Sequence, residues 1–253
     1  IKELISKLSI SLHKEIIGII YNPFREEGIQ NQDVLFLTEL LKNTSYIYPL
    51  IILHGPGGNF APSVYIPHII KKYVTKYKVF VPGICSSALC YTIFKAEELI
   101  LLPNSKITQI DPKFNYNGEE LRAINHLHCS DPSLKDTARE VFDAAQKQVE
   151  ELIKRPSIFK YRFLDPGEFQ HTELIVSHFM NKEKHETPIT TKELEEIELN
   201  FTINTNEEVN TISKLFIERC TEFMCQKEVR VIFISSIPLK IENDEGTYVC
   251  PLK

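Results

Sequence analysis

Two short turns in the first half of the chain carry residue types that could perform acyl-transfer chemistry. The sequence Gly-Pro-Gly-Gly at residues 55–58 follows an apolar run at 50–53, and Ser86 and Ser87 follow a second apolar run at 79–81. A serine hydroxyl becomes a nucleophile when a neighbouring base takes its proton, and a glycine-rich turn lets backbone N–H groups approach a substrate carbonyl. Together the two turns offer a candidate nucleophile and candidate oxyanion donors.

The elements that must position these turns form a βαβ pattern between residues 51 and 113. The two apolar runs are short and rich in β-branched residues, which is typical of strands, and each ends at a turn containing Pro and Gly. Between the runs, apolar residues recur at helical spacing. These are Val64, Ile66, Ile69, Ile70 and Val74. In such α/β folds, sites form where strands end and helices begin, so the two turns are expected to lie together.

Outside this stretch the chain is expected to add strands and several helices. Residues 15–21 predict a buried strand, Asp33 predicts the N-cap of a helix, and residues 133–155 predict a long amphipathic helix. Two further helices are expected at 167–180 and 207–224. Between them, a helix is expected to start at Thr190 or Thr191, with Thr191 in a capping-box arrangement. A strand is expected at 228–234 and a frayed tail at 243–253.

We therefore expect a single domain over residues 1–253. Its α/β core would span about 15–115, its mainly helical part about 116–225, and its C-terminal strand and tail 226–253.

Composition limits the class of protein. A chain of 253 residues with 43% hydrophobic and 25% charged residues can build a sizeable core. Its net charge of −5 argues against nucleic acid as a partner. The six cysteines show no zinc-ligand spacing, so we expect no metal, buried free thiols and a cytoplasmic location. No apolar run is long enough to span a bilayer, and membrane association is expected only through a segment preceding Ile1.

Four segments, in this order, resemble a known family of serine peptidases. They are HGPGG at residues 54–58, SSALC at 86–90, AEELIL at 96–101 and ITQIDPK at 107–113. This series resembles the ClpP/crotonase superfamily, in particular its serine dehydrogenase proteinase branch, which is related to signal peptide peptidase A. HETPIT at 185–190 also resembles a family segment. The resemblance implies an α/β, ClpP/crotonase-like spiral of βαβ units with a helical C-terminal region.

The resemblance implies that Ser87 is the nucleophile. The N–H group of Ala88, with those of Gly57 and Gly58, would then form the oxyanion hole. A serine at the start of a helix is also exposed and close to positive dipole density. The alternative is a purely structural role, in which Ser86 and Ser87 are an N-cap pair.

The base that would accept the serine proton is less narrowly defined. His185 is the first candidate because its context matches the family segment, and Asp111 could orient a base or cap its own turn. A Ser–Lys pair involving Lys113, Lys135 or Lys147 is an alternative.

Three further residues near the two turns each have two interpretations. Cys85 and Cys90 flank the serines and could supply a thiol nucleophile or pack the helix. His54 either matches the family's histidine in function or is a buried, hydrogen-bonded residue.

Departures from the family pattern bear on activity. Leu89 and Cys90 stand where the family has Gly and Thr, and Thr108 and Gln109 stand where it has Gly and Pro. A leucine could crowd the site.

The first functional hypothesis is a serine hydrolase that cleaves peptide bonds in a peptide or protein substrate, without ATP, metal or organic cofactor. The alternatives are a catalytically inactive scaffold for peptide binding or assembly, and an acyl-CoA enzyme of the crotonase type. The resemblance also implies a homo-oligomer.

Overall fold

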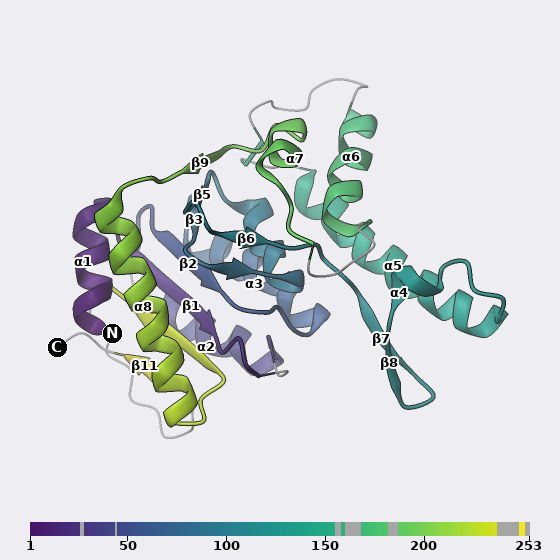
Figure 1. The fold of residues 1–253 in the computed structure, drawn as a ribbon, viewed down its shortest axis with the longest axis horizontal. Helices are drawn as coiled ribbons and strands as arrows, with labels where there is room; N and C mark the ends of the chain where they lie inside the picture. Colours follow the sequence, from purple (N-terminus) through teal and green to yellow (C-terminus); the bar gives the residue numbers. More distant parts are fainter. Residues whose placement is uncertain are drawn as a thin grey trace.

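The structure is a computed structural model that describes residues 1–25, 28–43, 45–154, 158–159, 168–181, 187–236 and 248–250. Its described part is a mixed α/β protein in which helices cover both faces of a mainly parallel sheet (Figure 1). The predicted α/β class with βαβ units, followed by a helical C-terminal region, is confirmed.

The described residues form one sheet of seven strands in the order β11-β10-β1-β2-β3-β5-β9. Five of the strands are parallel to one another, whereas β10 runs antiparallel to β1. The strands are β1 (Ile16–Tyr21), β2 (Leu50–His54), β3 (Lys78–Val81), β5 (Leu99–Leu101), β9 (Phe201–Ile203), β10 (Val231–Ser235) and β11 (Tyr248–Cys250). Two small pairs stand apart from this sheet. They are β4 (Ile84–Cys85) with β6 (Lys106–Ile107), and β7 (Lys113–Tyr116) with β8 (Glu119–Arg122).

Helices on the two faces of the sheet bury separate apolar cores. Side chains alternate along β1, so that Ile17 and Ile19 enter one core while Ile16 and Ile20 enter the other. The larger core lies under α2 (Asn31–Lys42), α3 (Phe60–Tyr73), the 3₁₀ helix η1 (Ser87–Lys95), α5 (Pro132–Ile153), α6 (Glu168–Met180) and α7 (Thr191–Glu196). The smaller core lies under α1 (Lys2–Leu12) and α8 (Glu207–Gln226), which pack side by side (Figure 1).

The β7–β8 hairpin and the short helix α4 (Ala123–His126) extend from the body beside α5 (Figure 1). The hairpin was not predicted. Its residues show no strong apolar alternation, and the hairpin is defined by the antiparallel pairing of the two strands, from Lys113 opposite Arg122 to Tyr116 opposite Glu119.

Most predicted elements are present, and three details were wrong. Asp33 does not cap α2, because Gln30 occupies the N-cap in an extended conformation and the Asp33 side chain reaches back to it from the third helical position. Thr190 rather than Thr191 caps α7, with Glu193 closing the capping box. The expected frayed tail contains β11, which pairs with β10.

No helix among the described residues is long and apolar enough to cross a membrane.

The packing of the smaller core predicts that two phenylalanines contribute very differently to the free energy of unfolding. Phe80 of β3 is fully buried between the sheet and its helices, whereas Phe24 is 80% exposed. Phe80→Ala should lower the free energy of unfolding in urea by about 3–5 kcal/mol, because it removes apolar contacts and leaves a cavity. The control Phe24→Ala should change it by less than about 0.5 kcal/mol. Equal effects of the two substitutions would contradict this packing.

Candidate functional site

Ser87 sits at a sharp, strained turn between a strand and a helix. The chain leaves β4 through Ser86, which is extended (φ −112°, ψ 152°), and then turns at Ser87, the first residue of η1, with φ +52°. A positive φ in a residue with a side chain costs about 1–3 kcal/mol and persists only where the surroundings impose it. Here the N–H of Leu89 donates to the Ser86 carbonyl (3.2 Å), and the N–H of Ser87 points to Thr108 Oγ1 (3.4 Å).

The glycine turn lies directly against this serine. A Cβ atom on Gly57 would stand 2.8 Å from Ser87 Cβ and 3.1 Å from the Ala88 nitrogen, so no other residue fits there without a shift. Gly57 and Gly58 also have positive φ values of +101° and +148°. The structure therefore brings together the two turns that the sequence analysis paired.

Two backbone N–H groups beside Ser87 lack an acceptor among the residues that the structure describes. These are the N–H groups of Gly58 and Ala88. Ala88 is the second residue of η1, where a helical N–H has no intrahelical partner. Both residues line the same cavity as Ser87, so both donors are available to an oxyanion.

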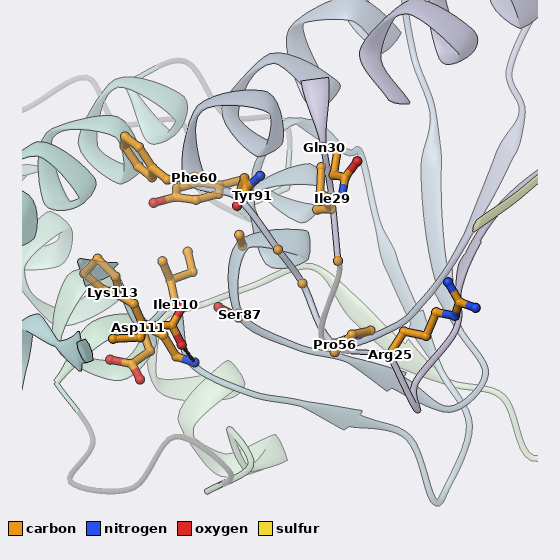
Figure 2. Close-up of a pocket in the computed structure, with 17 residues that line it drawn as sticks. Arg25, Ile29, Gln30, Pro56, Phe60, Ser87, Tyr91, Ile110, Asp111 and Lys113 are labelled. Carbon is orange, nitrogen blue, oxygen red and sulfur yellow. Dashed lines mark hydrogen bonds and ion pairs between the residues drawn. The ribbon is translucent and has the colours of Figure 1, made fainter. Parts of the chain in front are cut away.

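The cavity has a volume of about 600 Å³, which is the size of a site for a small ligand or for a peptide segment. Phe60 and Tyr91 form an aromatic wall in edge-to-face contact, with ring centroids 6.0 Å apart. Arg25 and Pro56 lie toward the opposite end, and Ser87 lies between the two ends (Figure 2). The cavity thus has an apolar end and a cationic end on either side of the serine.

Asp111 lines the cavity from the turn after β6, and its carboxylate is buried and ion-paired with Arg122 of β8. Lys113 also lines the cavity, where it pairs with Glu120 across the β7–β8 hairpin at 2.8 Å. Neither Lys135 nor Lys147 lines it. Its position in the cavity therefore distinguishes Lys113 from the other two candidate lysines, which the sequence alone did not do.

His185 lies outside the described residues. The nearest described segment after it returns to the site, since Pro188 bridges Thr108 and the Ile189 N–H donates to the Ile107 carbonyl at 2.8 Å. Thr108 is the residue whose hydroxyl accepts from the Ser87 N–H. His185 stays a predicted base.

The cysteines and the leucine next to the serine belong to the core. Leu89 is fully buried in the larger core and does not line the cavity, so it does not crowd the site. Cys90 Sγ lies 3.2 Å from the Thr108 carbonyl oxygen and 3.3 Å from that of Cys85. Burial raises the pKa of the Cys85 thiol well above its ordinary value, which disfavours the nucleophilic thiolate. These thiols pack the helix.

His54 is a structural residue at the end of β2. Its ring is buried, and its Nδ1 accepts a hydrogen bond from the Ile84 N–H at 3.3 Å, which ties β2 to β4. Burial lowers the pKa of His54 from 6.5 to about 4, so the ring is neutral near pH 7. His54 does not line the cavity.

Sequence reasoning missed the loop that supports the glycine turn from behind. The Ile29 N–H donates to the Gly57 carbonyl (2.8 Å), and the Asn59 N–H donates to the Ile29 carbonyl (2.9 Å). The Glu27-Gly28 turn signal was visible, but nothing in it specified this contact. The part of the chain that the structure describes also contains no group of three or more His, Cys, Asp or Glu side chains that could hold a metal ion.

Comparison with known proteins gives distant likenesses. No family model matches the sequence. The chain is 25% identical over 173 residues to the uncharacterized protein MJ0137 of Methanocaldococcus jannaschii, an alignment that covers 66% of this chain and 57% of that protein. The chain thus spans less than two thirds of that relative's length.

Two solved structures are similar in fold. A ClpP1 mutant from Listeria monocytogenes aligns with 80% of this chain and 99% of its own (16% identity, TM-score 0.47). A mutant of the membrane-bound stomatin-specific protease 1510-N, in complex with a substrate peptide, aligns with 70% of each chain (14% identity, TM-score 0.45).

The buried state of His54 predicts a pH dependence of stability. Its folded-state pKa of about 4 lies below the unfolded value of 6.5, so the unfolded chain binds the proton more tightly. Stability from this group is complete above pH 6.5 and is lost as the pH falls toward 4, by roughly 3 kcal/mol in total. In His54→Asn, the free energy of unfolding in urea should fall less steeply as the pH is lowered from 6.5 to 4. The exposed-residue control His128→Asn should keep the native slope, and an unchanged slope in His54→Asn would refute the assignment.

Proposed function

We propose that the chain is a ClpP-like serine hydrolase that cleaves peptide bonds with Ser87 as its nucleophile. The observation that carries the proposal is the placement of Ser87. Its strained turn holds the serine against Gly57, in a cavity of about 600 Å³ that also contains the N–H groups of Gly58 and Ala88, for which the described residues provide no acceptor. Strain and unsatisfied donors at one point in a cavity are typical of a site prepared for a substrate.

The proposed reaction proceeds by acyl transfer. Ser87 Oγ attacks the substrate carbonyl carbon while its proton passes to the base, for which His185 is the first candidate. The carbonyl oxygen becomes an oxyanion that accepts hydrogen bonds from the Gly58 and Ala88 N–H groups. The base then protonates the leaving amine as the C–N bond breaks, and water hydrolyses the acyl-serine by the reverse sequence. These steps use no ATP, metal ion or organic cofactor.

Asp111 is proposed to act beside the reacting groups. Its carboxylate lines the cavity and is fixed by Arg122, so it can orient a protonated base without moving. Lys113 is the alternative base, because it lines the same cavity.

The departures from the family pattern support an active site more than an inactive scaffold. Leu89 lies in the core, and Thr108 supplies a hydroxyl that accepts from the Ser87 N–H. Both changes support the turn that carries the serine and leave the cavity open. An inactive, peptide-binding scaffold is the outcome if no acylation occurs.

The proposed substrate is a peptide or protein. The Phe60–Tyr91 wall favours an apolar side chain next to the scissile bond.

We further propose a cytoplasmic homo-oligomer, and the β7–β8 hairpin that extends from the body is a suitable element for contacts between subunits (Figure 1).

Labelling with a fluorophosphonate probe tests the nucleophile. The native chain should be labelled stoichiometrically, and Ser87→Ala should abolish labelling because Ser87 is the only serine among the described residues that line the cavity. Ser86→Ala is the matched control, since this buried neighbour does not line the cavity, and it should keep the label. Labelling that survives in Ser87→Ala would sink the assignment, and an unlabelled native chain would favour the scaffold.

The pH dependence of labelling tests the base. With His185 as base, the labelling rate should rise with pH around the ordinary histidine pKa of about 6.5, and His185→Gln should lower the plateau rate about 10²- to 10⁴-fold. His128→Gln, a change at an exposed histidine, should leave both unchanged. A larger loss in Lys113→Met than in His185→Gln would assign the proton to a Ser–Lys pair instead.

A further inference from the structure

A buried ion pair lies behind the glycine turn. Arg230, just before β10, places Nη1 2.7 Å from Asp33 Oδ2 and donates through Nη2 to Asp33 Oδ1. The Asp33 side chain is fully buried and that of Arg230 is only 10% exposed. Charges this deep are tolerated only when they are paired and hydrogen-bonded, so the position of each group is tightly fixed.

Both partners of this pair hold the loop at residues 28–30. Arg230 Nη1 also donates to the Gly28 carbonyl at 2.6 Å, and the Gln30 N–H donates to Asp33 Oδ2 at 2.8 Å. The ion pair therefore fixes the peptide groups on both sides of Ile29.

Ile29 in turn fixes the direction of the Gly57–Gly58 peptide. Its N–H donates to the Gly57 carbonyl at 2.8 Å, and its carbonyl accepts from the Asn59 N–H at 2.9 Å. In a trans peptide the C=O and the following N–H point in opposite directions, and the described residues contain no cis peptide. Because the Gly57 carbonyl faces Ile29, the Gly58 N–H faces away from it, toward the cavity that it shares with Ser87.

The loop and the turn are in direct backbone contact. A Cβ atom on Gly28 would stand 1.9 Å from the Gly57 carbonyl oxygen, and one on Gly58 would stand 1.8 Å from the Ile29 nitrogen. A displacement of the loop therefore moves the turn as well, since no side chain lies between them to absorb it.

We propose that Arg230 is a positioning residue for the oxyanion hole. Through Gly28 and Asp33 it holds Ile29 in place, and Ile29 aims the Gly58 N–H at the carbonyl that Ser87 attacks. The catalytic part of this inference rests on the proposed hydrolase function. The mechanical part, from Arg230 to the Gly57–Gly58 peptide, does not.

Arg230→Lys is the informative substitution. A lysine keeps the positive charge but lacks the planar fork that reaches Gly28 and both Asp33 oxygens. Amide hydrogen exchange followed by NMR should become at least about tenfold faster at Ile29 and Asn59, because their bonds open locally, while Ile52 and Leu53 in β2 stay protected. With a short peptide p-nitrophenyl ester, kcat should fall about tenfold or more, with KM within about twofold, because an oxyanion donor acts mainly in the transition state.

Two further variants separate positioning from general stability. Lys78→Met removes a partly buried cation that pairs with Glu98 at the opposite end of β3, and it should change neither the exchange at Ile29 nor kcat. The double variant Asp33→Asn with Arg230→Met removes both charges together, which avoids an isolated buried carboxylate. It should show the local loss of protection even if Arg230→Lys does not fold.

Three results would overturn the proposal. They are unchanged exchange at Ile29 and Asn59 in a folded variant, exchange that accelerates equally in β2, and a fall in kcat without a change in exchange. If the native chain neither turns over the ester nor reacts with a fluorophosphonate, the hydrolase function fails. The exchange measurement then still decides whether Arg230 holds the turn.

Discussion

The close approach of two backbone segments at Gly57 is the constraint on which the rest of the site depends. A side chain at this position would collide with the Ser86 carbonyl oxygen and Ser87 Cβ, so the serine turn and the glycine turn can meet only where Gly57 has no side chain. Two hydrogen bonds prepare the meeting: the Gly55 N–H donates to the Ile84 carbonyl (2.9 Å), and the Ser86 N–H donates to the Gly55 carbonyl (3.1 Å). The site thus forms where the parallel pairing of strands continues past the carboxyl end of β2, from Gly55 to Cys85 of β4.

The pairing of the two turns was predictable because it follows from a general rule. Parallel strands joined by right-handed crossovers end at the same edge of the sheet, so turns after neighbouring strands must be close. The runs at 50–53 and 79–81, which lie in β2 and β3, had clear apolar patterns, whereas the two-residue strand β4 directly before Ser86 was not predicted. The glycines limited what could lie against the turns. The α/β class and most helices followed from the same local signals.

The support behind the turn could not be predicted, for two physical reasons. Arg230 and Asp33 are 197 residues apart, and nothing local in either segment reports the other. Aspartate is also favourable both at an N-cap and in the first helical turn, so the sequence around Asp33 did not distinguish the two positions. The extended conformation of Gln30 decides between them, and it depends on the contact of loop 28–30 with the glycine turn.

Departures from a family pattern were also hard to interpret from sequence. Leu89 and Cys90 follow the serine closely in sequence, yet both are buried in the larger core and neither lines the cavity. A helix start places consecutive side chains on different faces, so closeness along the chain says little about closeness to the reacting atoms.

The position of Arg230 along the chain has a consequence for biosynthesis. Both turns and the serine precede Arg230, which comes after α8, so they leave the ribosome before it does. On the role proposed for Arg230, a nascent chain would carry the serine turn while the Gly28 loop still lacked its anchor. Synthesis order would then delay a working oxyanion hole until the segment after α8 had been made.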